Sequence, residues 1–164
     1  MALFPSEEWV NLFKDAVNSN AAYEDAAKTW EGDFLFVVQP DSTLKEQAVL
    51  YVDLWHGKCR GVALLSSGEM KQTAFVYEGP YGNWVKLIRK EIDPIQGLLT
   101  GKFKLKGDML KVLRAVRAAK ALVDTASHAS HRDLLLKCRS KEAGELVQRS
   151  CRHIWEVHVD DEIE

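Results

Sequence analysis

The residue with the strongest potential for covalent chemistry is a cysteine between two glycines. The run from 57 to 61 reads Gly-Lys-Cys-Arg-Gly, which is the spacing of a nucleophile elbow with cysteine in place of serine. His56 would then act as the base of a cysteine–histidine pair. An elbow needs a helix after the nucleophile, whereas the apolar residues 62–65 are typical of a strand. The pattern favours a hairpin and leaves a cysteine hydrolase at Cys59 as a distant alternative.

Residue types that bind zinc gather towards the C-terminal end. They are His128, His131, Cys138, Cys151 and His153. Their spacing matches no compact zinc motif. The glycine patterns that bind phosphate and the His-Glu-x-x-His motif of metalloproteases are absent from the sequence. We therefore predict no metal site, no cofactor and no catalytic residue, so that the protein is not an enzyme.

Composition narrows the class of protein further. The chain has 164 residues, of which 46% are hydrophobic, and this is enough for one domain with a sizeable core. The net charge of −2 argues against nucleic acid as the main partner. No apolar run approaches the ~20 residues that cross a bilayer, and no signal peptide or peroxisomal address is visible. Three cysteines without a framework spacing suit reduced thiols, so we expect a cytoplasmic protein.

The elements that must position any site follow from periodicity and turn residues. Apolar residues at helical spacing predict helices near 7–17, 21–30, 81–91 and 109–123. Alternating or continuous apolar runs predict strands near 34–38, 47–56, 59–65, 73–77 and 102–106. Neither face of the strand at 47–56 is simply polar.

The segment 92–109 has the clearest local pattern. Asp93 before Pro94 suits a helix N-cap followed by proline in the first turn. After a glycine, Phe103 and Leu105 alternate with lysines, as in a strand with one buried face. A second glycine precedes Asp108, which can cap the next helix. The segment therefore predicts a helical turn, a short strand and a new helix.

The run Leu-Thr-Gly-Lys-Phe-Lys-Leu-Lys-Gly-Asp-Met at 99–109 resembles the C-terminal hallmark of the sterol-carrier-protein domain family. The run Tyr-Glu-Gly-Pro-Tyr-Gly-Asn-Trp at 77–84 is similar to a prokaryotic-type branch of that family. The resemblance covers roughly residues 6–123. It implies an α/β (α+β) fold in which a five-stranded, mainly antiparallel sheet carries helices on one face and encloses an apolar cavity. The predicted elements agree with this fold in number and order.

The resemblance implies non-enzymatic intracellular lipid binding or transfer, with a fatty acyl, acyl-coenzyme A, sterol-like or isoprenoid ligand. The alternative is an accessory module that presents lipid, or docks, to an enzyme complex such as one of quinone biosynthesis. The residues that we expect to contact lipid are Leu50, Val52, Leu54, Phe75, Leu98, Phe103, Leu105, Met109, Val112, Leu113 and Val116.

Basic side chains form a further candidate surface around the helix that starts at Met109. Their simplest interpretation is a solvated face; the functional one is transient contact with anionic headgroups or with the phosphates of an acyl-coenzyme A. The residues assigned to headgroup contact are Lys102, Lys104, Arg114 and Arg117.

The last part of the chain changes character. We assign residues 1–126 to the sterol-carrier-like domain and 127–164 to a helix-prone C-terminal extension, partly disordered, which either closes the cavity or lies free. Within it, Ser130 to Asp133 fits a capping box that would start a new helix. The sequence leaves the oligomeric state open.

Overall fold

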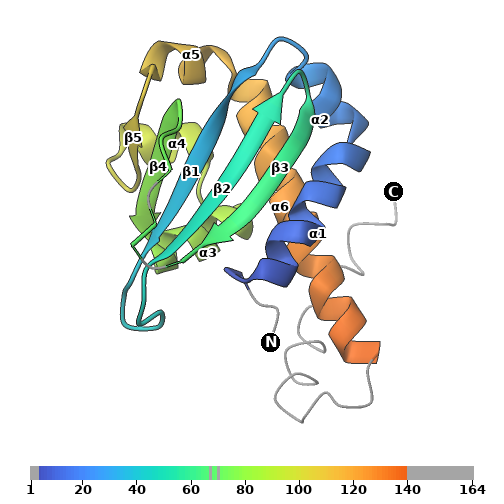
Figure 1. Ribbon diagram of the computed structural model, residues 1–164, viewed down its shortest axis with the longest axis vertical. Coiled ribbons are helices and arrows are strands. Elements are labelled where there is room, and N and C mark those ends of the chain that lie inside the picture. The colour runs from blue at the N-terminus through green and yellow to red at the C-terminus, as the bar shows by residue number, and fades with distance from the viewer. Residues whose placement is uncertain (1–3, 67, 70, 140–164) are drawn as a thin grey trace.

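A five-stranded sheet carries helices on one face (Figure 1). The structure is a computed structural model that describes residues 4–66, 68–69 and 71–139, with the backbone alone described from 131 to 139. The strands lie in the order β3-β2-β1-β4-β5; β1 and β4 are parallel, and the other neighbours are antiparallel. This confirms the predicted fold class. In chain order the elements are α1 (Glu7–Ser19), α2 (Ala21–Ala26), β1 (Glu31–Gln39), β2 (Ala48–Trp55), β3 (Lys58–Leu65), β4 (Phe75–Pro80), α3 (Tyr81–Ile88), α4 (Pro94–Leu99), β5 (Lys104–Lys106), α5 (Met109–Arg114) and α6 (Val116–Arg139).

Capping side chains set the start of four helices. Ser6 Oγ accepts a hydrogen bond of 3.1 Å from a backbone N–H of α1, and Asn20 Oδ1 accepts two from α2. Asp93 and Asp108 do the same for α4 and α5, as their positions before Pro94 and after the second glycine predicted. Each cap satisfies N–H groups that have no partner inside the helix.

The turn between β2 and β3 is a tight hairpin, as predicted. His56 and Gly57 both have positive φ angles, of 47° and 78°, which suits the right-handed twist of the flanking strands. A side chain at Gly57 would also collide with α2, because its Cβ would lie 2.6 Å from the carbonyl oxygen of Glu24. Because Gly57 has no side chain, the hairpin and α2 can lie in close contact.

Both faces of the sheet are covered, which explains the lack of a polar face in β2. Helices cover one face (Figure 1). On the other, Leu35, Val37 and Val49 form a small buried cluster. From the segment between β3 and β4, Lys71 Nζ lies 3.7 Å from the centroid of the Tyr51 ring, and the Ala74 N–H donates to Asp33 Oδ1 at 2.8 Å.

Two predictions for the region of α5 and α6 differ from the structure. The helix expected at 109–123 divides at Ala115, where the backbone N–H bonds to the Val112 carbonyl in a tighter turn before α6 begins. The prediction of a new helix after Ser130 was wrong, because α6 runs unbroken through this residue. The Ser130 hydroxyl accepts a hydrogen bond of 2.8 Å from Trp9 Nε1 in α1 instead of capping a helix. The boundary drawn at 126 falls inside α6, and the expectations for 140–164 lie outside the described residues.

Strand β5 is shorter than predicted, because the backbone N–H groups of Lys102 and Phe103 donate to the Gly97 carbonyl at 2.9 and 3.1 Å. The Phe103 ring then stacks on Tyr77 with 4.8 Å between centroids. It fills the space left by two glycines: a Cβ at Gly79 would lie 2.5 Å from the ring, and one at Gly97 would lie 2.9 Å from it. Phe103 therefore joins β4, α4 and the start of β5.

Substitution of Gly79 by alanine is expected to displace the Phe103 ring and to lower the free energy of unfolding by about 1–3 kcal/mol. Gly61→Ala is the matched control, because a Cβ at Gly61 has no atom within 4 Å. Urea denaturation of both variants measures the difference. Equal stabilities would contradict the role given to Phe103.

Candidate functional site

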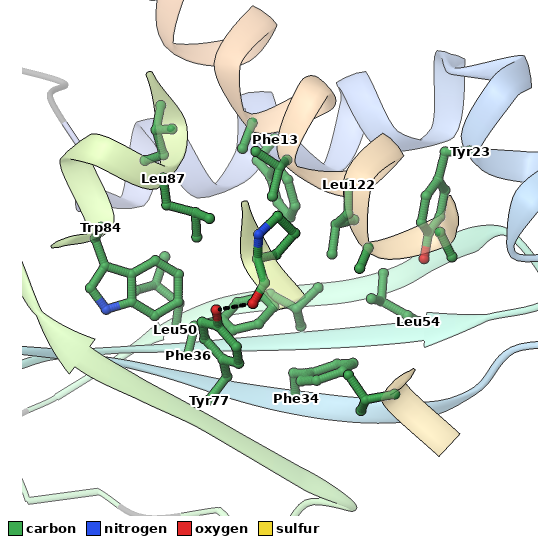
Figure 2. Close-up of a pocket in the computed structure, with 18 of the residues that line it drawn as sticks. Phe13, Tyr23, Phe34, Phe36, Leu50, Leu54, Tyr77, Trp84, Leu87 and Leu122 are labelled. Atoms are coloured by element: carbon green, nitrogen blue, oxygen red, sulfur yellow. Dashed lines mark hydrogen bonds between the residues drawn. The ribbon is translucent and has the colours of Figure 1, made fainter. Parts of the chain in front are cut away.

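An apolar cavity of about 120 Å³ lies between the sheet and the helices (Figure 2). Figure 2 shows Trp84 and Leu87 at one end and Tyr23 and Leu54 at the other. The side chains that line the cavity come from nearly every element on this face. They are Phe4, Trp9, Phe13, Tyr23, Trp30, Phe34, Phe36, Leu50, Val52, Leu54, Tyr77, Trp84, Leu87, Ile88, Pro94, Ile95, Leu98, Val112, Ala115, Ala118, Ala119, Leu122, Val123 and Ala126.

The sheet side of the cavity follows from strand alternation. Phe34 and Phe36 project from β1 toward the helices, and they are opposite Val52 and Leu50 of β2 in the register. Leu54 extends the same row toward the hairpin. Because successive side chains on a strand point to opposite faces, a single register places all these residues in one wall.

The helix side of the cavity combines small residues of α6 with larger side chains from the other helices. Ala118, Ala119 and Ala126 face the cavity, together with Ala115 before the helix begins. Leu122 and Val123 of α6 line it as well. Beyond the cavity, α6 is joined to the start of α2 by a hydrogen bond from Asn20 Nδ2 to Thr125 Oγ1 at 2.8 Å.

The few polar groups in the lining mostly bond to the protein itself. The Tyr77 hydroxyl donates to the Pro94 carbonyl at 3.1 Å, drawn as a dashed line in Figure 2. Trp84 Nε1 donates to the carbonyls of Val37 and Gly79 at 3.1 and 3.0 Å. Burial raises the pKa of the Tyr77 phenol well above its usual value, so it stays a donor. Among the residues that the structure describes, none with a charged side chain lines the cavity.

The volume limits what fits without rearrangement. An apolar cavity of ~150 Å³ binds benzene in another protein, and this one, at about 120 Å³, is slightly smaller. It therefore accommodates one ring or a short stretch of chain as it stands. A longer lipid must move the walls apart or leave part of itself outside.

The structure divides the predicted lipid contacts into two sets. Those in the cavity lining are Leu50, Val52, Leu54, Leu98 and Val112; those outside it are Phe75, Phe103, Leu105, Met109, Leu113 and Val116. Phe75 lies beside Phe34 on the neighbouring strand, with 5.0 Å between ring centroids, and Met109 is 38% exposed. A role in lipid contact stays a prediction for both sets.

Several lining residues were not predicted from the sequence, among them Tyr23, Phe34, Phe36 and Trp84. A signal for the two phenylalanines was present, since they alternate along β1. It was hidden because Leu35, between them, is equally apolar and is buried on the opposite face. The alanines of α6 carried no signal, because alanine suits any part of a helix.

The predicted headgroup residues lie at the surface. Lys102, Lys104 and Arg114 are exposed. Arg117 is also exposed but lies 3.6 Å from Asp25, in an ion pair that solvent screens strongly. Their contact with a membrane stays a prediction.

Cys59 has none of the features of an activated nucleophile. It lies at the start of β3, is 2% exposed, and its backbone N–H and carbonyl both bond to the Asn18 side chain. Burial raises the pKa of its thiol to about 11. His56 Nε2 lies 2.7 Å from Glu31 Oε1, so its ring is directed to that carboxyl group. A strand follows the cysteine, so the elbow geometry is absent at this position.

The candidate zinc ligands are only partly within the described structure. His128 Nδ1 lies 2.7 Å from the Asp124 carbonyl. The side chains of His131 and Cys138, and all of Cys151 and His153, lie outside the described residues. Within the described part, no group of three or more His, Cys, Asp or Glu residues is arranged to hold a metal. In the same part, no helix is long and apolar enough to cross a membrane.

Comparison with known proteins gives a consistent set of relatives. The model of the SCP-2 sterol transfer family matches residues 10–120. A crystal structure of sterol carrier protein 2 is 30% identical, with a TM-score of 0.67 over 74% of this chain and 95% of that one. A conserved hypothetical protein of Thermus thermophilus, described as possibly a sterol carrier protein, is also 30% identical, with a TM-score of 0.70 over 79% and 91%.

A more distant structure shares the fold alone. The apo form of sterol carrier protein 2 from Yarrowia lipolytica is 14% identical, with a TM-score of 0.51 over 77% of this chain and 98% of that one. A comparison with curated protein sequences gave no match.

The raised pKa of Cys59 predicts slow reaction with a thiol reagent such as DTNB. At pH 8 a thiol of pKa about 11 is ionised to only ~0.1%, so the native rate should be far below that of the unfolded chain. Stopped-flow measurement on a Cys138→Ser/Cys151→Ser variant isolates this thiol, with the urea-unfolded chain as the reference. Native reactivity equal to that of the unfolded chain at pH 7–8 would restore the hydrolase alternative.

Proposed function

The chain belongs to the SCP-2 sterol transfer family, as the segment 92–109 predicted, and we propose that it binds a lipid non-covalently in the cavity between sheet and helices. The lipid is fatty acyl, sterol-like or isoprenoid in type, and the protein carries it rather than transforming it. The observation that supports this proposal above all is the cavity itself, with its apolar lining.

The energetic cost of the cavity supports a function for it. An empty cavity destabilises a protein by roughly 24 cal/mol per Å³. For a sealed void of about 120 Å³ this cost is about 3 kcal/mol, a large part of the 5–15 kcal/mol by which a typical domain is stable. A few larger side chains on α6 would fill the space. A ligand that occupies the cavity recovers the same free energy on binding.

The expected affinity suits a carrier. If the walls move apart far enough to bury about 16 methylene groups, this burial contributes about 13 kcal/mol at ~0.8 kcal/mol each. Association and ordering oppose this by about 4–15 kcal/mol. The difference spans weak to sub-micromolar binding, which allows the lipid to be both held and released.

The surface near α5 supports a second step, transient contact with an anionic membrane. Met109 and Leu110 are 38% and 66% exposed, so α5 presents apolar side chains to solvent. Lys104 precedes them in β5, and Arg114 ends the helix. Val112, from the same helix, lines the cavity. Contact through α5 would therefore bring one wall of the cavity to the lipid surface.

Enlarging Val112 to tryptophan tests the cavity as the binding site. The new side chain should fill the cavity and weaken binding of a fluorescent fatty acid or sterol analogue at least tenfold, while the circular dichroism spectrum is retained. Val116→Trp is the matched control, because Val116 is partly exposed and lies outside the lining. A lowered melting temperature with unchanged probe affinity would show that the ligand lies elsewhere. Absence of saturable binding for all probes would favour a docking module.

Charge reversal tests the membrane step. Lys104→Glu/Arg114→Glu should slow lipid transfer to anionic vesicles but not to neutral ones, since each basic group near a charged surface contributes about 1 kcal/mol at low salt. Lys45→Glu/Lys86→Glu carries the same change of charge in the β1–β2 loop and α3, at the end of the sheet away from α5 (Figure 1). Equal slowing of lipid transfer by both pairs would show that the rate depends on net charge and not on the surface near α5.

A further inference from the structure

One polar group in the cavity lining has no partner in the described protein. The side-chain N–H groups of Trp9, Trp30 and Trp84 and the hydroxyl of Tyr77 each donate to a protein oxygen. Tyr23 also lines the cavity and is only 2% exposed, yet its hydroxyl makes no hydrogen bond with any residue that the structure describes. Among the described residues, no fully enclosed side-chain nitrogen or oxygen lacks a partner. The small accessible part of Tyr23 therefore includes its oxygen, which is open to the cavity and free to bond with an occupant.

The position of this hydroxyl is fixed by the structure around it. Tyr23 lies in α2, and its backbone N–H donates to the cap at Asn20. The close contact between Gly57 and the Glu24 backbone holds α2 against the β2–β3 hairpin, and Lys58 Nζ lies 2.8 Å from Glu24 Oε2. Figure 2 shows the ring at the hairpin end of the cavity, with its oxygen directed toward the sheet beside Leu54.

The charge state of this end of the cavity restricts what can bind there. Burial, together with the nearby Cys59, raises the pKa of the Tyr23 phenol well above its usual value, so the hydroxyl stays protonated and can donate. The described lining holds no cation that would pair with an anion. An ionised carboxylate placed there would lose its hydration without a counter-ion, whereas a neutral oxygen would lose far less.

We propose that Tyr23 donates a hydrogen bond to a single neutral oxygen, a hydroxyl or a carbonyl, at the end of a lipid lying in the cavity. This inference rests on the proposed function and narrows it to a class of ligand. The apolar body of the lipid extends from Tyr23 toward Trp84, and the site selects a long-chain alcohol, sterol or ester over an alkane and over an ionised fatty acid.

The test uses the full chain with diphenylhexatriene as an apolar fluorescent probe. Three ligands of equal length, 1-dodecanol, dodecane and dodecanoate at pH 8, compete with the probe in wild type, in Tyr23→Phe and in Tyr51→Phe. Tyr51 is the control, since its hydroxyl lies on the outer face of the sheet, 3.3 Å from Asp33. Tyr23→Phe removes only an unpartnered hydroxyl, so its melting temperature should equal or exceed that of wild type.

Wild type should bind dodecanol more tightly than dodecanoate, and Tyr23→Phe should weaken dodecanol binding by roughly 2- to 12-fold while leaving dodecane binding unchanged. Equal effects of Tyr23→Phe on dodecanol and dodecane would overturn the inference and leave the lipid-binding function intact. Dodecanoate binding as tightly as dodecanol in wild type would overturn it without any variant. Failure of the probe and of all three ligands to bind would overturn both the inference and the proposed function.

Discussion

The structure depends on incomplete packing between the two layers that face each other. The sheet presents the rings of Phe34, Phe36 and Tyr77, and α6 contributes three alanines together with Leu122 and Val123. Protein interiors normally pack as densely as organic crystals, so large groups opposite small ones close up unless something holds the layers apart. Here the layers stay apart, and the space between them becomes a cavity lined by carbon.

Hydrogen bonds join α6 to the helices beside it. The Trp9 indole N–H bonds to Ser130, and Asn20 bonds to Thr125, so that α6 is joined to both N-terminal helices. Thr125 is only 2% exposed, and its hydroxyl also donates to the Ala121 carbonyl. Such buried hydrogen bonds are directional, and breaking one leaves an unsatisfied group. They can therefore keep a helix in place over a space that apolar contact alone would collapse.

Much of the fold could be predicted from the sequence, because helix caps and turns depend on neighbouring residues and no tertiary contact overrides them here. Asp93 before Pro94, and Asp108 after Gly107, marked helix starts that the structure shows. The hairpin at Gly57 followed from the strand pattern on either side. The break at Ala115 could not be predicted, because no glycine or proline marks it and it arises where the chain turns to cover the sheet. The same is true of Ser130, whose role depends on Trp9, 121 residues away.

The candidate site was less accessible to prediction than the fold. Leu50, Val52 and Leu54 were assigned to the cavity from their alternation, and they line it. Phe103 was assigned for the same reason, yet it packs into the space left by Gly79 and Gly97. Periodicity tells which face a residue occupies; whether that face meets a cavity or another layer depends on the volumes of residues distant in sequence.

The account rests on one central claim, that the space between sheet and helices holds a lipid. Native mass spectrometry of the protein purified from cells, and of the same protein after incubation with neutral lipids, tests it most directly. We expect a population heavier than the bare chain by the mass of one lipid, which is released by mild collisional activation and depleted in a variant with a filled cavity. The mass of the bare chain alone, in both samples, would contradict the claim.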